Sequence, residues 1–76
     1  MVTSAQLRAA RSLLDWTVRG LADRANVHRN TVSRAEGQDE GHGFAVAQIV
    51  RTFQEAGIEF LSDKDGAGVR LRKLAE

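Results

Sequence analysis

Four polar side chains in a short stretch of the sequence could make directional hydrogen bonds to another molecule. They are Arg29, Asn30, Ser33 and Arg34. Helical spacing would place all four on one face, opposite Val32 and Ala35. Arginine and asparagine can each pair with a base edge through two hydrogen bonds, and a DNA major groove admits one helix. An idle surface helix more often carries glutamate and lysine, so this face favours the reading of DNA.

The surrounding stretch predicts two short helices that meet at a tight turn. The first helix has apolar residues at i, i+3, i+4 and i+7, namely Val18, Leu21, Ala22 and Ala25. Thr17 can cap this helix, and Asn26 tolerates the left-handed conformation that a sharp turn needs. A second helix is predicted over about residues 29–36, and Gly37 is expected to end it in a left-handed conformation. The pattern predicts a helix-turn-helix, with an ordinary helical hairpin in a small bundle as the alternative.

Two further helices are predicted on either side of this pair. Thr3 and Gln6 form a capping-box pattern at the start of a helix over about residues 4–14, whose inner face would hold Leu7, Ala10 and Leu14 with Leu13 beside them. Trp16 is expected to close the core between the first two helices. Another amphipathic helix is predicted over residues 44–55, with Gly57 marking its end.

The C-terminal part changes to an alternating pattern and predicts a β-hairpin with a rather long loop over residues 62–68. Glu59 would lie on the same face as Arg70 or Arg72 and form a cross-strand charge pair. The apolar face would hold Ile58, Phe60, Val69 and Leu71. Because an isolated hairpin is barely stable, this face must either pack on the helices or meet a second hairpin across a dimer axis. We favour the second arrangement, in which these four residues form the dimer contact.

The predicted fold class is therefore mainly α, with four helices that include the helix-turn-helix and with a C-terminal two-stranded β-hairpin. The boundaries are a DNA-binding domain over residues 1–56 and a hairpin extension over residues 57–76, which is a candidate dimerisation element. A chain of 76 residues forms one small core, and association with a partner is expected to help stabilise it.

The charge is unevenly distributed along the chain. The net charge is only +1. Residues 1–34 carry six arginines against Asp15 and Asp23, a net +4, whereas residues 35–76 carry five basic and eight acidic groups, a net −3. The basic half coincides with the predicted helix-turn-helix, as an electrostatic footprint for nucleic acid requires. All six basic residues are arginines, which suit bidentate contacts to phosphate and guanine.

Catalytic, metal and membrane functions find no support in the sequence. There is no cysteine, and His28 and His42 are fourteen residues apart without a ligand-like spacing. Ser12 and Ser33 lack an evident base and oxyanion loop. We therefore expect no enzyme activity, no metal or other cofactor and no small-molecule ligand. No apolar run approaches the length of a membrane span, so we expect a cytoplasmic protein with no membrane partner.

Several residues of the helix-turn-helix together resemble those of the phage repressor and Cro family, the xenobiotic-response-element type. They are Trp16-Thr17, Leu21-Ala22, Val27, Thr31-Val32 and Glu36-Gly37. The resemblance covers about residues 4–56 and extends less specifically to the C-terminal hairpin. It implies a repressor/Cro-like fold and a transcriptional regulator, a repressor or a regulator of a phage or mobile element. Such proteins bind inverted-repeat operators in double-stranded DNA as homodimers, which would place this chain on the nucleoid.

The resemblance also implies roles for individual residues. Contacts to bases are expected from Arg29, Asn30, Ser33 and Arg34. Contacts to phosphates are expected from Thr17, Arg19, His28, Thr31 and Gln38. A charged pair of Arg11 and Glu36 would tie the first helix to the end of the third and would be structural.

Three positions depart from the family pattern. Val18 replaces the usual glutamine, which removes a backbone contact that Arg19 could supply. Gly20 lies inside a helix, where it costs about 1 kcal/mol relative to alanine. His28 occupies the N-cap of the recognition helix, where serine or threonine is customary. A neutral imidazole can accept a capping hydrogen bond, and a protonated one could meet phosphate, so a pH switch is one hypothesis.

A second function of a different class stays open at this point. The fold could serve as a protein-interaction adaptor or anti-activator that has lost DNA binding. Val18 and the acidic second half of the chain favour this alternative. Arg29, Asn30 and Arg34 favour DNA binding, which is the function that we predict.

Overall fold

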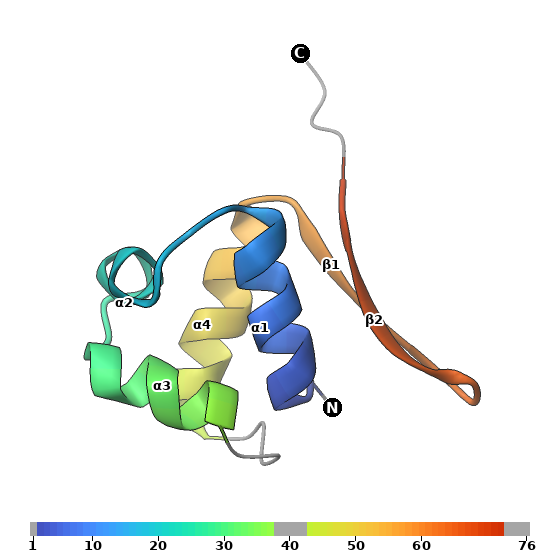
Figure 1. Ribbon diagram of the computed structural model, residues 1–76, viewed down its shortest axis with the longest axis horizontal. Coiled ribbons are helices and arrows are strands. Elements are labelled where there is room, and N and C mark those ends of the chain that lie inside the picture. Colours follow the sequence, from blue (N-terminus) through green and yellow to red (C-terminus); the bar gives the residue numbers. More distant parts are fainter. Residues whose placement is uncertain (1, 38–42, 73–76) are drawn as a thin grey trace.

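A computed structural model describes residues 2–37 and 43–72 and has four helices followed by a two-stranded hairpin (Figure 1). The elements in order are α1 (Ser4–Leu13), α2 (Val18–Ala25), α3 (Arg29–Gly37), α4 (Phe44–Glu55), β1 (Ile58–Asp63) and β2 (Gly66–Leu71). Helices α1 and α4 lie between α3 on one side and the hairpin on the other (Figure 1). The predicted fold class, mainly α with four helices and a C-terminal two-stranded hairpin, is confirmed.

Local signals in the sequence account for most helix boundaries. Thr3 accepts the backbone N–H of Gln6, and Gln6 accepts the backbone N–H of Thr3 at 2.8 Å, so the predicted capping box is present. Thr17 caps α2 by accepting the N–H of Gly20 at 2.9 Å. Asn26 ends α2 in the left-handed conformation at φ 58° and ψ 45°. Thr3 and Thr17 accept backbone N–H groups that have no partner within the helix, and Asn26 turns the chain away from the helix axis.

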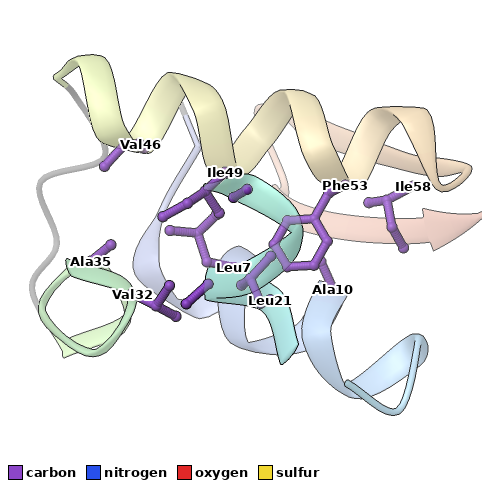
Figure 2. Close-up of a cluster of buried hydrophobic side chains, with 11 residues drawn as sticks. Leu7, Ala10, Leu21, Val32, Ala35, Val46, Ile49, Phe53 and Ile58 are labelled. Carbon is purple, nitrogen blue, oxygen red and sulfur yellow. The ribbon is translucent and has the colours of Figure 1, made fainter. Parts of the chain in front are cut away.

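The core lies where all four helices and the first residue of β1 meet (Figure 2). Its largest fully buried side chains are Phe53, Leu7, Leu21, Ile49 and Val32. Leu14 packs against this cluster at its edge. Leu13 was expected beside the inner face of α1 but is 46% exposed, because it falls just beyond the stripe of Leu7 and Ala10.

Trp16 packs against the core from the segment between α1 and α2, and its ring lies against α4, a contact that the sequence did not indicate. Its ring stacks on Phe53 with centroids 5.8 Å apart. The guanidinium carbon of Arg24 lies 4.4 Å from the centroid of the Trp16 ring. The indole is thus held between an α4 aromatic ring and a cation, an arrangement that aromatic quadrupoles favour.

The end of α3 also differs from the expectation. The helix continues through Gly37, whose φ is not positive, so Gly37 is not a left-handed stop. Arg8 of α1 donates a hydrogen bond from Nη1 to the carbonyl oxygen of Glu36. A side chain from another helix therefore satisfies one of the last carbonyl groups of α3, which have no partner within the helix.

The hairpin is longer and its turn is tighter than predicted. Pairing runs from Ile58↔Leu71 to Asp63↔Gly66, so the long loop expected over residues 62–68 is mostly strand. Only Lys64 and Asp65 lie between the strands. The side chain of Asp63 accepts the N–H of Asp65 at 2.8 Å, which stabilises the reversal as an Asx turn does.

Glu59 forms the predicted cross-strand charge pair, and it does so with both candidate arginines. Arg70 Nε donates to Glu59 Oε1 at 2.6 Å, and Arg72 Nε lies 3.7 Å from Glu59 Oε2. All three side chains lie on the face of the hairpin that carries Leu61.

The opposite, apolar face of the hairpin packs on its own helices, which is the arrangement that we did not favour. Ile58 is 2% exposed, and Phe60 meets Phe53 edge to face at 6.1 Å. Val69 is half-buried against the same cluster, whereas Leu71 is 43% exposed. Ile58 is therefore not available for a dimer contact, because it is buried in the core of one chain; a contact through Phe60, Val69 and Leu71 stays a prediction.

Gln6 attaches the hairpin to α1 by polar contacts. Its Nε2 donates to the carbonyl oxygens of Leu61 and Gly68, at 2.9 and 2.8 Å, which belong to one pair of the β ladder. Its Oε1 caps α1 at the same time. Both halves of one amide are therefore used, and Gln6 is only 3% exposed. No helix in the described part of the chain is long and apolar enough to cross a membrane.

The two roles of Gln6 can be separated by Gln6→Glu. A carboxylate still accepts the Thr3 N–H but faces two carbonyl oxygens with no proton to donate. We expect a loss of about 1–3 kcal/mol of unfolding free energy at neutral pH, since a buried polar group is left unpaired. The measurement is urea denaturation, with Thr3→Ala as the control that removes only the cap. A Gln6→Glu protein as stable as the wild type would contradict this account.

Candidate nucleic-acid interface

Helices α2 and α3 form a tight helical corner. Leu21 and Val32 are fully buried, and Ala22 is small enough for the two backbones to approach. The N–H of Val27 bonds to the carbonyl oxygen of Ala22 at 3.0 Å, which closes the end of α2 into the turn. Val27 packs against the core from the turn. The corner fixes which face of α3 remains on the surface.

The exposed face of α3 carries the four side chains expected to contact bases. Arg29, Asn30, Ser33 and Arg34 are all exposed. Val32, Ala35 and Glu36 are the buried residues of the same helix. The hairpin packs on α1 and α4 and leaves this face uncovered (Figure 1). The four side chains are thus brought together on an accessible helix, as the sequence indicated; their contacts to bases stay a prediction.

His28 caps α3 through its imidazole ring. Its Nδ1 accepts the backbone N–H of Asn30 at 3.0 Å, and its carbonyl oxygen accepts the N–H of Thr31 at 2.9 Å. A nitrogen that accepts a hydrogen bond carries no proton, so Nδ1 is unprotonated in this arrangement. Of the two roles considered from the sequence, the structure has the imidazole as a hydrogen-bond acceptor at the cap. The imidazole therefore replaces the usual serine or threonine hydroxyl at this position.

Gly20, for which the sequence offered no role, lies directly beside the cap of α2. A Cβ atom built on Gly20 would lie 3.1 Å from Thr17 Oγ1. That hydroxyl accepts the Gly20 N–H. A larger residue would crowd the capping oxygen, which is a local reason for glycine at a position where alanine has the higher helix propensity.

The residues expected to contact phosphate do not all lie in one place. Arg19 and His28 line an open cavity of about 360 Å³ between α2 and α3, together with Arg29 and Asp23. Thr17 is exposed at the start of α2, and Thr31 is half-buried on α3. Gln38 lies outside the described residues. The cavity brings two arginine side chains, a neutral imidazole and one carboxylate to the entrance of the corner; contacts of these residues to phosphate stay a prediction.

Three of the six N-terminal arginines are used within the protein. Arg11 donates from Nε and Nη2 to the two carboxylate oxygens of Glu36, at 2.8 and 3.1 Å, and from Nη1 to the carbonyl oxygen of Trp16 at 3.1 Å. The hydrogen bond to Glu36 raises the pKa of Arg11. The charged pair between the first and third helices is therefore present. Arg8 holds the same end of α3, and Arg24 covers Trp16.

The other three arginines are available to another molecule. Arg19, Arg29 and Arg34 are exposed and make no ion pair or side-chain hydrogen bond with any residue that the structure describes. All three lie on α2 or α3, the two helices of the corner. The positive charge is therefore concentrated at the corner in a form that can still bind an anion.

Sequence reasoning missed Arg8 and Arg24 as structural residues. Arg8 lies three residues before Arg11 on α1, a helical spacing that places both on one side and could have indicated a shared partner on α3. Nothing in the sequence signals that Arg24 meets Trp16. Within residues 2–37 and 43–72, no group of three or more histidine, cysteine or acidic side chains is placed to hold a metal ion.

Comparison with known proteins adds no family to this geometry. No protein-family model matches the chain. No curated protein sequence matches it either.

The cap formed by His28 predicts how substitutions there affect folding. His28→Ala removes the acceptor for the Asn30 N–H, and we expect a loss of about 1 kcal/mol of unfolding free energy. His28→Asn keeps a side-chain acceptor at the N-cap and should stay close to the wild type. Urea denaturation at neutral pH measures both variants. Equal stability of the alanine and asparagine variants would show that the hydrogen bond contributes nothing.

Proposed function

We propose that this protein is a sequence-specific DNA-binding transcriptional regulator whose α3 helix enters the major groove. The observation that carries the proposal is a set of three arginines at the α2–α3 corner, beside exposed Asn30 and Ser33. Contacts within the protein account for Arg8, Arg11 and Arg24, whereas Arg19, Arg29 and Arg34 have no partner among residues 2–37 and 43–72. The repressor/Cro-like pattern of the sequence favours the same function.

The chemistry of α3 suits base edges. Arginine pairs with guanine O6 and N7, and asparagine pairs with adenine N6 and N7. Arg29 and Asn30 begin α3, and Arg34 follows one turn later. Side chains in these places would contact successive base pairs when the helix lies in the groove. Ser33 would add a weaker contact between them.

Phosphate contacts would position the corner on the duplex. Arg19 and His28 line the cavity at the corner, and Thr17 and Thr31 lie near the helix ends that would meet the backbone. Such contacts carry little sequence information but supply much of the affinity, so binding should weaken steeply with salt.

We further propose that the regulator acts as a homodimer on an inverted repeat, in the cytoplasm on nucleoid DNA. Two recognition helices would enter successive major grooves about 34 Å apart, which predicts half-sites about 10 bp between centres. The small core of a single chain is consistent with association.

Selection of bound duplexes from a random library at moderate salt tests the function. An enriched inverted repeat is expected and would also give the operator. An enriched single half-site would retain DNA binding but contradict the dimer. If a folded protein enriches nothing and its binding to random DNA does not change with salt, DNA binding is wrong and the adaptor function remains.

Arg34→Ala tests the direct reading of bases. We expect a loss of about 1–3 kcal/mol in binding, confined to one base pair of the selected site, with relaxed preference there. Arg51→Ala is a matched control, because Arg51 is an exposed arginine of α4 that pairs with Glu55 away from α3. Competition binding to single-base variants of the site measures both. An equal loss on every sequence would make Arg34 a phosphate contact.

A further inference from the structure

The distal part of the hairpin is exposed on both faces. Gln6 of α1 holds the pair of Leu61 and Gly68, but from Ser62 to Ala67 every residue is exposed. The hairpin projects past the helices on the side away from α3 (Figure 1). Since a two-stranded hairpin is marginal by itself, these residues are the part of the fold that gains most from another strand.

The outer edge of β1 has the shape and the backbone groups to accept that strand. An open groove of about 370 Å³ is lined by four consecutive residues of β1, from Ile58 to Leu61, with Gln54 and Arg72. Successive side chains of a strand point to opposite faces. A groove bordered by four consecutive residues therefore reaches the edge of the strand, as well as the face on which Arg72 lies against Glu59.

The register of the hairpin identifies which backbone groups of β1 face this groove. The Arg72 N–H bonds to the Gly57 carbonyl oxygen at 2.7 Å, so residues 57 and 72 form a hydrogen-bonded pair. Such pairs alternate along an antiparallel ladder. The backbone N–H and C=O groups of Glu59 and Leu61 therefore point toward β2. Those of Phe60 and Ser62 point outward, away from β2. The edge offers donors and acceptors that pair with an antiparallel strand.

We propose that β1 pairs with β1 of a second copy across a two-fold axis at Phe60, which joins two hairpins into a four-stranded sheet. The inference rests on the proposed function only for the need for a dimer. It replaces the contact predicted from the sequence, because it uses the free edge of β1 instead of the buried apolar face.

Charge decides among the registers that the backbone allows. Pairing Ile58 with Phe60 would place Glu59 directly opposite Glu59, and pairing Phe60 with Ser62 would place it opposite Asp63. Like charges directly opposite one another are destabilising. A two-fold axis at Phe60 instead places Glu59 opposite Leu61 of the second copy. An axis at Ser62 would engage fewer strand residues, because Phe60 would then face the turn.

This register also brings opposite charges near each other and apolar side chains into contact across the interface. Asp63 would lie opposite Gly57 of the second copy, whose own hairpin places Arg72 next to that glycine. Asp63 and this Arg72 would be about 10 Å apart at Cα on one face, with a bare glycine between them. Two Phe60 rings would meet at the axis and extend the contact with Val69. The interface leaves the exposed face of α3 free, because the hairpin packs on α1 and α4.

Cysteine cross-linking without DNA tests this register. The chain contains no cysteine, and Cα atoms of a non-hydrogen-bonded pair are about 4.5 Å apart, within the range of a disulfide. A mixture of Glu59→Cys and Leu61→Cys proteins should cross-link as a heterodimer under mild oxidation. Each variant alone should cross-link far less. A mixture that cross-links no more than the single variants, or Leu61→Cys proteins that mainly cross-link with each other, would overturn the register.

A second measurement does not depend on the cysteine variants. Leu61→Glu places a carboxylate directly opposite Glu59 of the second copy, and like charges directly opposite one another are destabilising. Sedimentation equilibrium should show the wild type dimerising and the variant at least about tenfold weaker. At a protein concentration at which both are monomers, the midpoint of urea unfolding should be unchanged. Ala47→Glu, at an exposed residue of α4, is the matched control. A wild type that stays monomeric at every concentration would overturn the interface while leaving DNA binding by α3 untouched.

Discussion

The carboxylate of Glu36 is the group on which the position of α3 depends. Its side chain is 9% exposed, and an ionised carboxylate in such a place is costly unless it is paired. Arg11 meets both carboxylate oxygens and also reaches the carbonyl oxygen of Trp16. One guanidinium therefore joins α1, the corner before α2, and the end of α3. The exposed face of α3 can be presented in a fixed direction because its C-terminal end is held in this way.

Helix α1 links the hairpin to α3. At its start, Gln6 holds the carbonyl groups of Leu61 and Gly68 in the hairpin. Further along the helix, Arg8 and Arg11 hold α3. If the hairpin edge pairs two copies, α1 is the element that relates the dimer axis to α3. The spacing of the two α3 helices would then depend on polar contacts along one ten-residue helix.

The division of the arginines reconciles a nearly neutral protein with a candidate DNA interface. Buried acceptors and an aromatic ring bind three of the six in the first half of the chain. Those at the α2–α3 corner have no partner within the part of the chain that the structure describes. Binding of a phosphate backbone depends on such local charge and on the counterions that it releases, more than on the net charge of the molecule.

The sequence by itself determined the local structure. Thr3, Thr17 and Asn26 act on backbone groups within a few residues, so their effects on helix ends could be predicted without the fold, and α4 has the bounds expected from its period. The exposed face of α3 also followed from spacing. The tertiary structure alone decided which arginines bind within residues 2–37 and 43–72, among them Arg8 at the end of α3. It also decided that Trp16 stacks on Phe53 and that the hairpin packs on its own helices. These outcomes depend on contacts between residues far apart in the chain. Periodicity predicts which side of a helix or strand a residue lies on, but it does not predict which distant residue that side will contact.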